Sequence, residues 1–241
     1  MFRMQKILSY VRRACQEFDL IQDGDKIAIG VSGGKDSMTL LESLARMRRF
    51  SEFNYDIYAI TLDPRFFGED GDFSPVTRLC EKLGVEHTLI RTDLYQIVFE
   101  IRKEKNPCSL CAKIRRGALH EATINAGCNK IALAHSYDDA IETFMMNLFK
   151  EGRIGCFSPK SYLSRRDLTM IRPLVFTPEH MIISHAKQYE IVKSPCPFDK
   201  HTERQRTKEF LHERELSDKG FKLRMFSALR KSGVDGWGYK K

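Results

Sequence analysis

The sequence predicts a doubly wound α/β fold, in which helices cover both faces of a parallel sheet. Short apolar runs alternate with longer segments whose apolar residues recur at helical spacing, and a glycine-rich loop separates the first run from the first such segment. Alternation of this kind builds parallel sheets with right-handed crossovers. With 241 residues, the chain is long enough for one sizeable α/β core.

The first half of the chain alternates regularly. Residues 1–20 are basic and amphipathic, and Glu17 and Asp19 favour an ordinary first helix over a transit peptide. Residues 26–31 form an apolar run closed by glycine, which predicts a strand. The same periodicities then predict helices over residues 36–49 and 75–83, and strands over residues 55–62 and 86–91.

The second half continues the pattern. There, apolar periodicity predicts helices over residues 110–126 and 138–149, and strands over residues 130–134 and 170–174, of which the latter is the fifth strand. A last crossover helix is predicted over residues 178–189. Beyond Ser194 the composition changes: residues 200–214 are strongly charged and predict a solvated helix, followed by a basic tail. We therefore expect one domain over residues 1–200 and a charged helical extension over residues 201–241.

Composition limits the classes of function. No apolar run approaches the roughly 20 residues of a membrane span, so we expect a cytoplasmic protein without membrane contact. The net charge of +8 permits a polyanionic partner without requiring one. The seven cysteines are odd in number and no secretory signal is present, so clustered cysteines indicate metal or redox chemistry rather than a disulfide framework.

The loop after the first strand has the sequence Ser32-Gly33-Gly34-Lys35-Asp36-Ser37. Its glycines let backbone amides approach an anion, and the following helix N-terminus adds partial positive charge. It is not a Walker loop, because three residues rather than four separate Gly30 from Gly34 and an aspartate follows the lysine. The loop resembles the Ser-Gly-Gly-x-Asp-Ser signature of the PP-loop ATP pyrophosphatases, which implies cleavage of ATP between its α and β phosphates.

The chemistry of the loop residues suggests a division of roles. Lys35 and the backbone amides would neutralise leaving pyrophosphate, and Ser32 and Ser37 would donate hydrogen bonds. Asp36 would orient the loop or a magnesium ion. Asp63, at the end of the second strand, lies where such enzymes seat the nucleoside; a cap for a turn or helix is the alternative.

Cys108 and Cys111 form a Cys-x-x-Cys pair before a helix, and this pattern fits a redox pair, half of a zinc site or part of an iron–sulfur site. Downstream, only Cys196 lies in a comparable position, between two prolines, with Asp199 three residues later. Three thiolates in all is the number that leaves one iron of a cluster without a protein ligand. Cys15, Cys80 and Cys128 are instead expected in the core.

His135 ends an apolar strand, and Asp138 and Asp139 open the next helix with Glu142 one turn later. Acidic residues at a helix start are ordinarily caps, so a purely structural role is open for at least one aspartate. The strand end faces the same sheet edge as the glycine loop, which favours a functional role for the group.

Several of these segments together resemble the tRNA 2-thiocytidine synthetase (TtcA) family over roughly residues 20 to 200. The resemblance rests on the glycine loop, on Cys108 to Leu119, on Asn129 to His135, on Asp138 to Thr143 and on Pro195-Cys196. It implies an adenine-nucleotide α-hydrolase fold, with ATP and Mg²⁺, and with a 4Fe-4S cluster held by Cys108, Cys111 and Cys196. It also places His135 and Asp139 at the ATP or base site. Family members often have a further cysteine where this chain has Asp199.

The function that the resemblance implies is tRNA thiolation: ATP adenylates the C2 carbonyl of a cytidine, and sulfur replaces the oxygen. The expected partners are tRNA and a sulfur donor such as a cysteine desulfurase or free sulfide, and a homodimer is possible. Two alternatives stay open. One is a cluster-free thiolase in which Cys108 or Cys196 carries a persulfide, and the other is a nucleotide or metal sensor without turnover.

Overall fold

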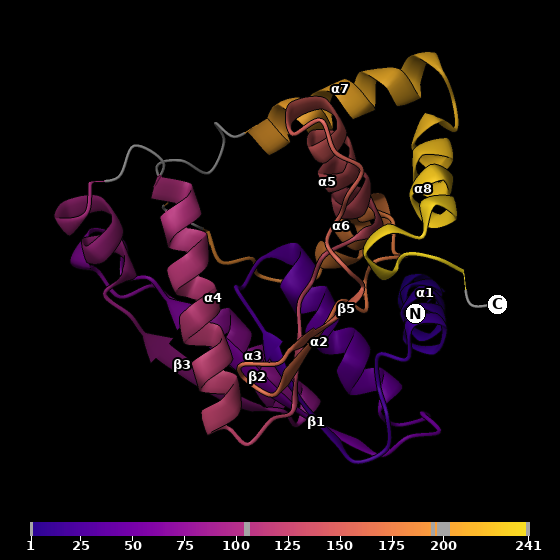
Figure 1. The fold of residues 1–241 in the computed structure, drawn as a ribbon. Coiled ribbons are helices and arrows are strands. Elements are labelled where there is room, and N and C mark those ends of the chain that lie inside the picture. Colours follow the sequence, from indigo (N-terminus) through magenta and orange to yellow (C-terminus); the bar gives the residue numbers. More distant parts are fainter. Residues whose placement is uncertain (1, 104–106, 194–195, 197–202, 240–241) are drawn as a thin grey trace.

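The computed structural model describes residues 2–103, 107–193, 196 and 203–239, and Figure 1 shows their arrangement. Six strands form one sheet in the order β3-β2-β1-β4-β6-β5. The strands are β1 (Asp25–Gly30), β2 (Tyr55–Asp63), β3 (Glu86–Arg91), β4 (Lys130–Ala132), β5 (Lys160–Leu163) and β6 (Leu168–Ile171). All neighbours pair in parallel except β5, which pairs antiparallel with β6. The doubly wound α/β prediction is confirmed.

Eight α-helices surround the sheet in the described part of the chain. They are α1 (Phe2–Phe18), α2 (Lys35–Met47), α3 (Ser74–Leu83), α4 (Pro107–Asn125), α5 (Tyr137–Lys150), α6 (Glu179–Ala186), α7 (Glu203–Ser217) and α8 (Phe221–Ser232). Shorter turns are the 3-10 helices Phe66–Gly68 and Val234–Gly236 and the π-helix Gln96–Ile101.

The central strand alternates between two cores, as expected for a strand buried on both faces. Ile27 and Ile29 of β1 belong to the large core that includes residues of α1, α2 and α6. Ala28 faces the other way, where Leu119 of α4 packs against the sheet. The elements of the large core and α4 therefore form two layers around the sheet, and α7 and α8 lie against α5 at one end of the molecule (Figure 1).

Among the strands and α-helices of the described residues, β5 and α8 were not predicted from the sequence. β5 is a short edge strand with alternating burial, and its residues Lys-Ser-Tyr-Leu give almost no strand signal. α8 lies in the segment that was expected to be a basic tail. Its Phe226 and Leu229, together with Trp237, are buried in the same core as α1, and the Trp237 indole Nε1 donates to the Phe157 carbonyl at 2.6 Å.

Candidate active site

The glycine loop connects β1 to α2 at the carboxyl edge of the parallel strands. Gly33 has a φ of +79°, a conformation that side chains other than hydrogen disfavour. A Cβ on Gly33 would lie 2.5 Å from Cγ2 of Val192. The Val192 amide also donates to the Gly33 carbonyl at 3.1 Å. Gly33 is therefore required both by the backbone and by the close packing of a segment from the far end of the chain.

The two serines of the loop bond within it. The Ser37 hydroxyl accepts from the Ser32 amide at 3.2 Å and donates to the Gly34 carbonyl at 3.0 Å. Gly34 is the N-cap of α2 and provides no side-chain cap, so the helix start keeps amides available for an anion. Ser37 thus fixes the shape of the loop, which is a different task from the expected donation to phosphate.

Lys35 lies between two carboxylates. Its Nζ is 2.7 Å from Oδ2 of Asp36 and 3.1 Å from Oε1 of Glu179 at the start of α6. Burial lowers the pKa of Lys35, but Asp36 and Glu179 outweigh that effect and raise the pKa above its ordinary value. Lys208 of α7 shares Glu179 at 2.7 Å. Lys35 is therefore a protonated cation that Asp36 and Glu179 hold in place beside the loop.

Asp139 and Glu142 place further negative charge close to the loop. Asp139 closes a capping box with Ser136, and its charge helps burial to raise the pKa of Asp36. Burial, with Asp139 second, raises the pKa of Glu142 to about 7. Arg204 of α7 spans the pair: its Nη1 lies 3.3 Å from Asp139 and 3.2 Å from Glu142. Asp139 is therefore both the predicted cap and a member of the acidic group.

Asp138 has a separate, structural set of contacts. Its Oδ2 accepts from the Glu179 amide at 2.7 Å, and its Oδ1 pairs with Lys222 of α8 at 2.8 Å. It therefore ties the start of α5 to α6 and α8.

His135 is neutral. Burial, helped by the neighbouring charge of Arg172, lowers its pKa to about 4. The Arg172 guanidinium donates from Nε to Nδ1 of the imidazole at 3.2 Å and lies 4.9 Å over the Phe157 ring. Because Nδ1 accepts this hydrogen bond, neutral His135 carries its proton on Nε2, and Arg172 fixes its orientation.

Asp63 serves the loop after β2. Its Oδ1 accepts from the Arg65 amide and its Oδ2 from the Gly71 amide, both at 2.9 Å. The residue is buried, so the described contacts give its carboxylate the turn-capping role that was the alternative to nucleoside binding.

The cysteines of the predicted cluster come from two distant segments. Cys108 is exposed and Cys111 is half-buried in the first turns of α4, and Cys196 is also half-buried. Burial raises the pKa of Cys111, and the charges of Cys196 and Cys108 add to this while Arg115 opposes it. Among the described residues, no three His, Cys, Asp or Glu side chains converge closely enough to hold a metal ion. The donor set nonetheless fits an iron–sulfur cluster, because thiolates are its usual ligands and the other two thiols are close enough to Cys111 for their charges to raise its pKa. Asp199 lies outside the described residues.

The other cysteines are structural, as predicted for Cys15, Cys80 and Cys128. All three are buried, and burial raises the pKa of Cys15 and Cys80 to about 12 and that of Cys128 to about 11. Cys156, which the sequence left unassigned, has its pKa raised to about 12 by burial, and its Sγ lies 3.4 Å from the Ala140 carbonyl. Thiols of this kind are unreactive.

A model of the PP-loop domain family matches residues 5–211 of this chain. The chain belongs to the PP-loop family. Within it, the tRNA-cytidine(32) 2-sulfurtransferase of Geobacter sulfurreducens is 37% identical over 232 residues, covering 94% of this chain and 90% of that protein. The same enzyme of Ralstonia pickettii is 35% identical over 229 residues, covering 93% and 72%. These matches place the chain in the tRNA-cytidine(32) 2-sulfurtransferase family, as the resemblance predicted.

The U34-tRNA thiolase NcsA from Methanococcus maripaludis, solved with its 4Fe-4S cluster, superposes with a TM-score of 0.73 and 24% identity. It covers 93% of this chain and 77% of that one, and this likeness shows the fold. No helix in the described residues is both long and apolar enough to cross a membrane.

Four residues of this PP-loop site were not found by reading the sequence: Glu179, Arg204, Lys208 and Arg172. None belongs to a local motif, and all reach the site from segments distant from the loop. The only local signal was Pro178, which predicted the helix start at which Glu179 stands.

Proposed function

We propose that this chain is an ATP-dependent tRNA sulfurtransferase that adenylates the C2 carbonyl oxygen of a cytidine and replaces that oxygen with sulfur. Membership of the tRNA-cytidine(32) 2-sulfurtransferase family supports cytidine 32 as the acceptor. The glycine loop and the cations around it would serve the adenylation step, and the three thiols would serve the transfer of sulfur.

One observation carries the proposal: the segment that leads to Cys196 is built onto the glycine loop. Val192 bonds to Gly33 in the loop, and Cys196, four residues later, acts electrostatically on Cys111 of α4. With 84 residues between Cys111 and Cys196, nothing local brings them together. One segment of the chain therefore contacts the glycine loop and leads to Cys196, which supports a site where one bound base is first activated and then thiolated.

In the first step, the C2 oxygen of the cytidine attacks the α-phosphorus of ATP, and the bond to the β-phosphate oxygen breaks. Pyrophosphate leaves with its negative charge on the loop amides and Lys35. Preorganised cations and amides of this kind stabilise the charge that develops on a leaving group. Lys35 already carries its proton, held by Asp36 and Glu179, so it acts as an electrostatic group and not as an acid.

In the second step, sulfide adds to C2 and AMP leaves with the original oxygen. Cys108, Cys111 and Cys196 would hold the 4Fe-4S cluster, and when bound it would offer one iron without a protein ligand at which sulfide can be kept. We propose that neutral His135, oriented by Arg172, is a hydrogen-bond partner for the base or nucleotide and adds no charge.

Magnesium fits the acidic group around the loop. Asp139 lies close enough to Asp36 for its charge to add to burial in raising the pKa of that carboxyl. Carboxylate oxygens together with phosphate oxygens suit Mg²⁺. We propose that both carboxylates bind Mg²⁺ when ATP is bound, because the ATP phosphates supply the remaining negative charge.

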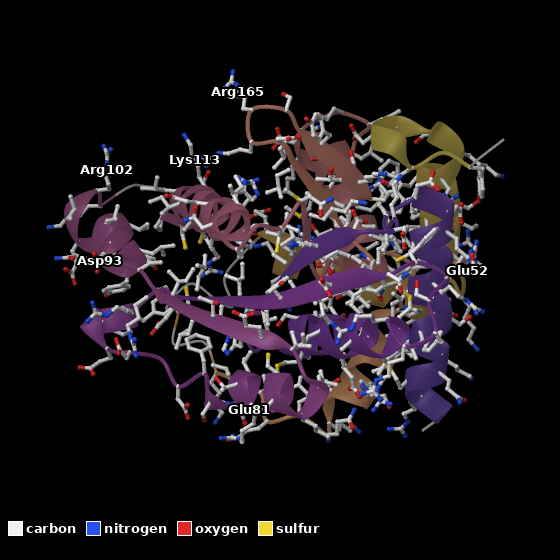
Figure 2. All side chains as sticks on the ribbon, turned by 90° about the horizontal axis from the view of Figure 1, so that it is seen from below. Glu52, Glu81, Asp93, Arg102, Lys113 and Arg165 are labelled. Atoms are coloured by element: carbon white, nitrogen blue, oxygen red, sulfur yellow. The ribbon has the colours of Figure 1, made fainter. Side chains whose placement is uncertain are left out.

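The proposed partners are tRNA and a sulfur donor such as a cysteine desulfurase or free sulfide. We also propose a cytoplasmic location, and a homodimer is compatible with this function. Figure 2 shows Arg102, Lys113 of α4 and Arg165 extending from one side of the molecule. Lys113 follows the Cys-x-x-Cys pair by two residues, so the cysteines lie next to cationic surface suited to RNA phosphate.

The test is product analysis with tRNA, ATP, Mg²⁺ and a sulfur source. AMP and pyrophosphate are expected, and Lys35→Ala abolishes turnover because it removes charge from the leaving group. ADP and phosphate as products would refute the assignment. Thiolation by a colourless protein with zinc at the cysteines would favour the persulfide alternative, and ATP binding without pyrophosphate release would favour the sensor.

A further inference from the structure

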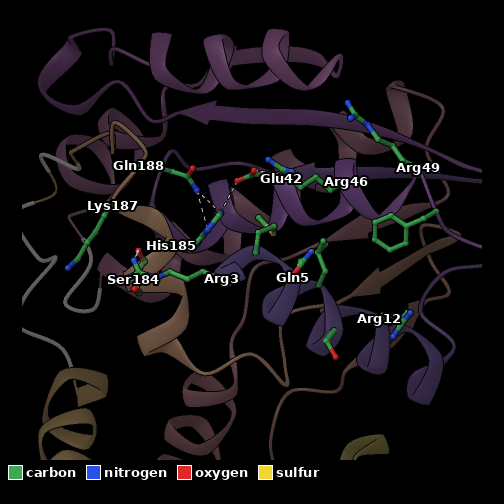
Figure 3. A pocket seen from close by; sticks show the side chains of 14 residues that line it. Arg3, Gln5, Arg12, Glu42, Arg46, Arg49, Ser184, His185, Lys187 and Gln188 are labelled. Atoms are coloured by element: carbon green, nitrogen blue, oxygen red, sulfur yellow. Dashed lines mark hydrogen bonds and ion pairs between the residues drawn. The ribbon is translucent and has the colours of Figure 1, made fainter. Parts of the chain in front are cut away.

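A groove of about 1150 Å³ opens on the part of the molecule built by α1, the second half of α2 and the end of α6 (Figure 3). It lies apart from the reaction chemistry: Arg46 is eleven residues beyond Lys35 along α2, which is about 16 Å along the helix axis. Neither the glycine loop nor any of the three cluster cysteines lines it.

The lining is cationic and polar. Eleven of its fourteen residues are charged or polar, and they include Arg3, Arg12, Arg46, Arg49 and Lys187. Figure 3 shows that these side chains extend from different segments: Arg3 and Arg12 extend from α1, and Arg46 extends from α2. Arg3 and Arg12 are nine residues apart, so the charges spread over about 13 Å of helix.

The single carboxylate of the groove is already neutralised. Glu42 lies on the floor and is buried; it accepts from Arg46 at 2.7 Å and bonds His185 at 2.9 Å and the Tyr189 hydroxyl. By contrast, within the described part of the chain the side chains of Arg12 and Arg49 have no ion-pair or hydrogen-bond partner. The groove therefore presents a surplus of exposed positive charge without an internal counter-charge.

We propose that this groove binds the phosphate backbone of the tRNA at a distance from the reacting base. A stretch of about 13 Å is long enough to contact more than one backbone phosphate, since each strand of duplex DNA carries one phosphate per about 3.4 Å of helix axis. Gln5, Ser9 and Ser184 add donors and acceptors for phosphate and ribose oxygens, and Phe50, 56% exposed at the groove, offers a ring to an unpaired base. Binding at two places sets the register of an elongated substrate without contacting the modified nucleotide. The inference rests on the proposed tRNA substrate.

The test compares Arg12→Glu/Arg49→Glu with a matched control, Lys82→Glu/Lys219→Glu, which reverses two exposed charges outside the groove. Binding of a tRNA transcript is measured between 50 and 200 mM salt. Each lost phosphate contact reduces the slope of log K against log salt by about 0.9, so the affinity of the groove variant should fall about tenfold less over this range. At low salt it should bind more weakly than wild type, and the control should match wild type.

Steady-state thiolation separates remote binding from damage to the reaction site. The groove variant should show a raised KM for tRNA and an unchanged kcat, because both arginines are distant from Lys35 and exposed. Wild-type affinity and salt slope in the groove variant would overturn the inference, as would an equal loss in the control. So would intact RNA binding with loss of a protein partner, which would assign the groove to an acidic protein. If wild-type protein thiolates no tRNA, the proposed function itself fails, whatever the groove variant does.

Discussion

Gly33→Ala tests whether the glycine loop and the segment before Cys196 form one packed unit. The substitution has two costs. An alanine at a φ of +79° pays a conformational cost of about 1–2 kcal/mol. Its Cβ would also lie 2.5 Å from Cγ2 and 2.6 Å from Cβ of Val192, and overpacking of this kind costs about 1–3 kcal/mol more.

Gly24→Ala is a matched control. Gly24 has a φ of +78°, and a Cβ there would meet nothing within 4 Å. It therefore carries the conformational cost without the overlap. In urea denaturation followed by circular dichroism, Gly33→Ala should lower the free energy of unfolding by about 1–3 kcal/mol more than Gly24→Ala does.

A double-mutant cycle isolates the contact. Val192→Gly removes the two Val192 atoms that the new Cβ would overlap and leaves only Val76 Cγ2 at 3.5 Å, so Gly33→Ala should cost less in that background than in the wild type. ATP affinity, measured by calorimetry, should fall in Gly33→Ala and recover in part in the double variant. Equal destabilisation by Gly33→Ala and Gly24→Ala, or simple additivity in the cycle, would refute the packing of Val192 on the loop.

Three further outcomes follow from the described contacts. Glu142 has a folded-state pKa of about 7 against an ordinary 4.5, so its stabilising contribution is complete below pH 4.5 and is lost as the pH rises through 7. Glu142→Gln should remove about 3 kcal/mol of that pH dependence in urea titrations at pH 5 and 8, and an unchanged dependence would contradict the shift. Arg204→Ala should raise the pKa of Glu142 further, measured by carbon-13 NMR of the carboxyl, because it removes the cation that opposes the shift; a fall would contradict the pairing. Cys111→Ala should abolish the brown chromophore after anaerobic reconstitution while Cys15→Ala keeps it, with ATP binding retained in both; a full cluster in Cys111→Ala would exclude that thiol as a ligand.

Local patterns predicted most of the sheet but not the edge strand β5. The bounds of β1, β2 and β3 match the expected ranges within a residue or two. The strand expected at residues 170–174 begins two residues earlier and ends at Ile171, because its pairing with β4 and β5 fixes its length. Cross-strand pairing of this kind is not visible in a single segment, and it is the only reason β5 exists as a strand.

The same limit applies to the site. The glycine loop and the Cys-x-x-Cys pair are contiguous motifs, and they were found because their chemistry depends on neighbours in sequence. Glu179 bonds Lys35 across 143 intervening residues, and Arg204 reaches Asp139 across 64. A charged helix such as α7 was predicted to be solvated because its own sequence cannot tell that two of its cations face buried carboxylates.

Arg204 and Lys208 connect the charged extension, which includes α7, to the site. Four carboxylates, Asp36, Asp139, Glu142 and Glu179, lie around the loop, and burial alone would drive several of them to take up protons. Arg204 and Lys208 stand one turn apart on α7 and each contacts this group. Lys208 helps to lower the pKa of Glu179, and Arg204 opposes the rise in the pKa of Glu142. The matched family region ends at residue 211, just beyond Lys208, so it contains this turn of α7 and stops before α8.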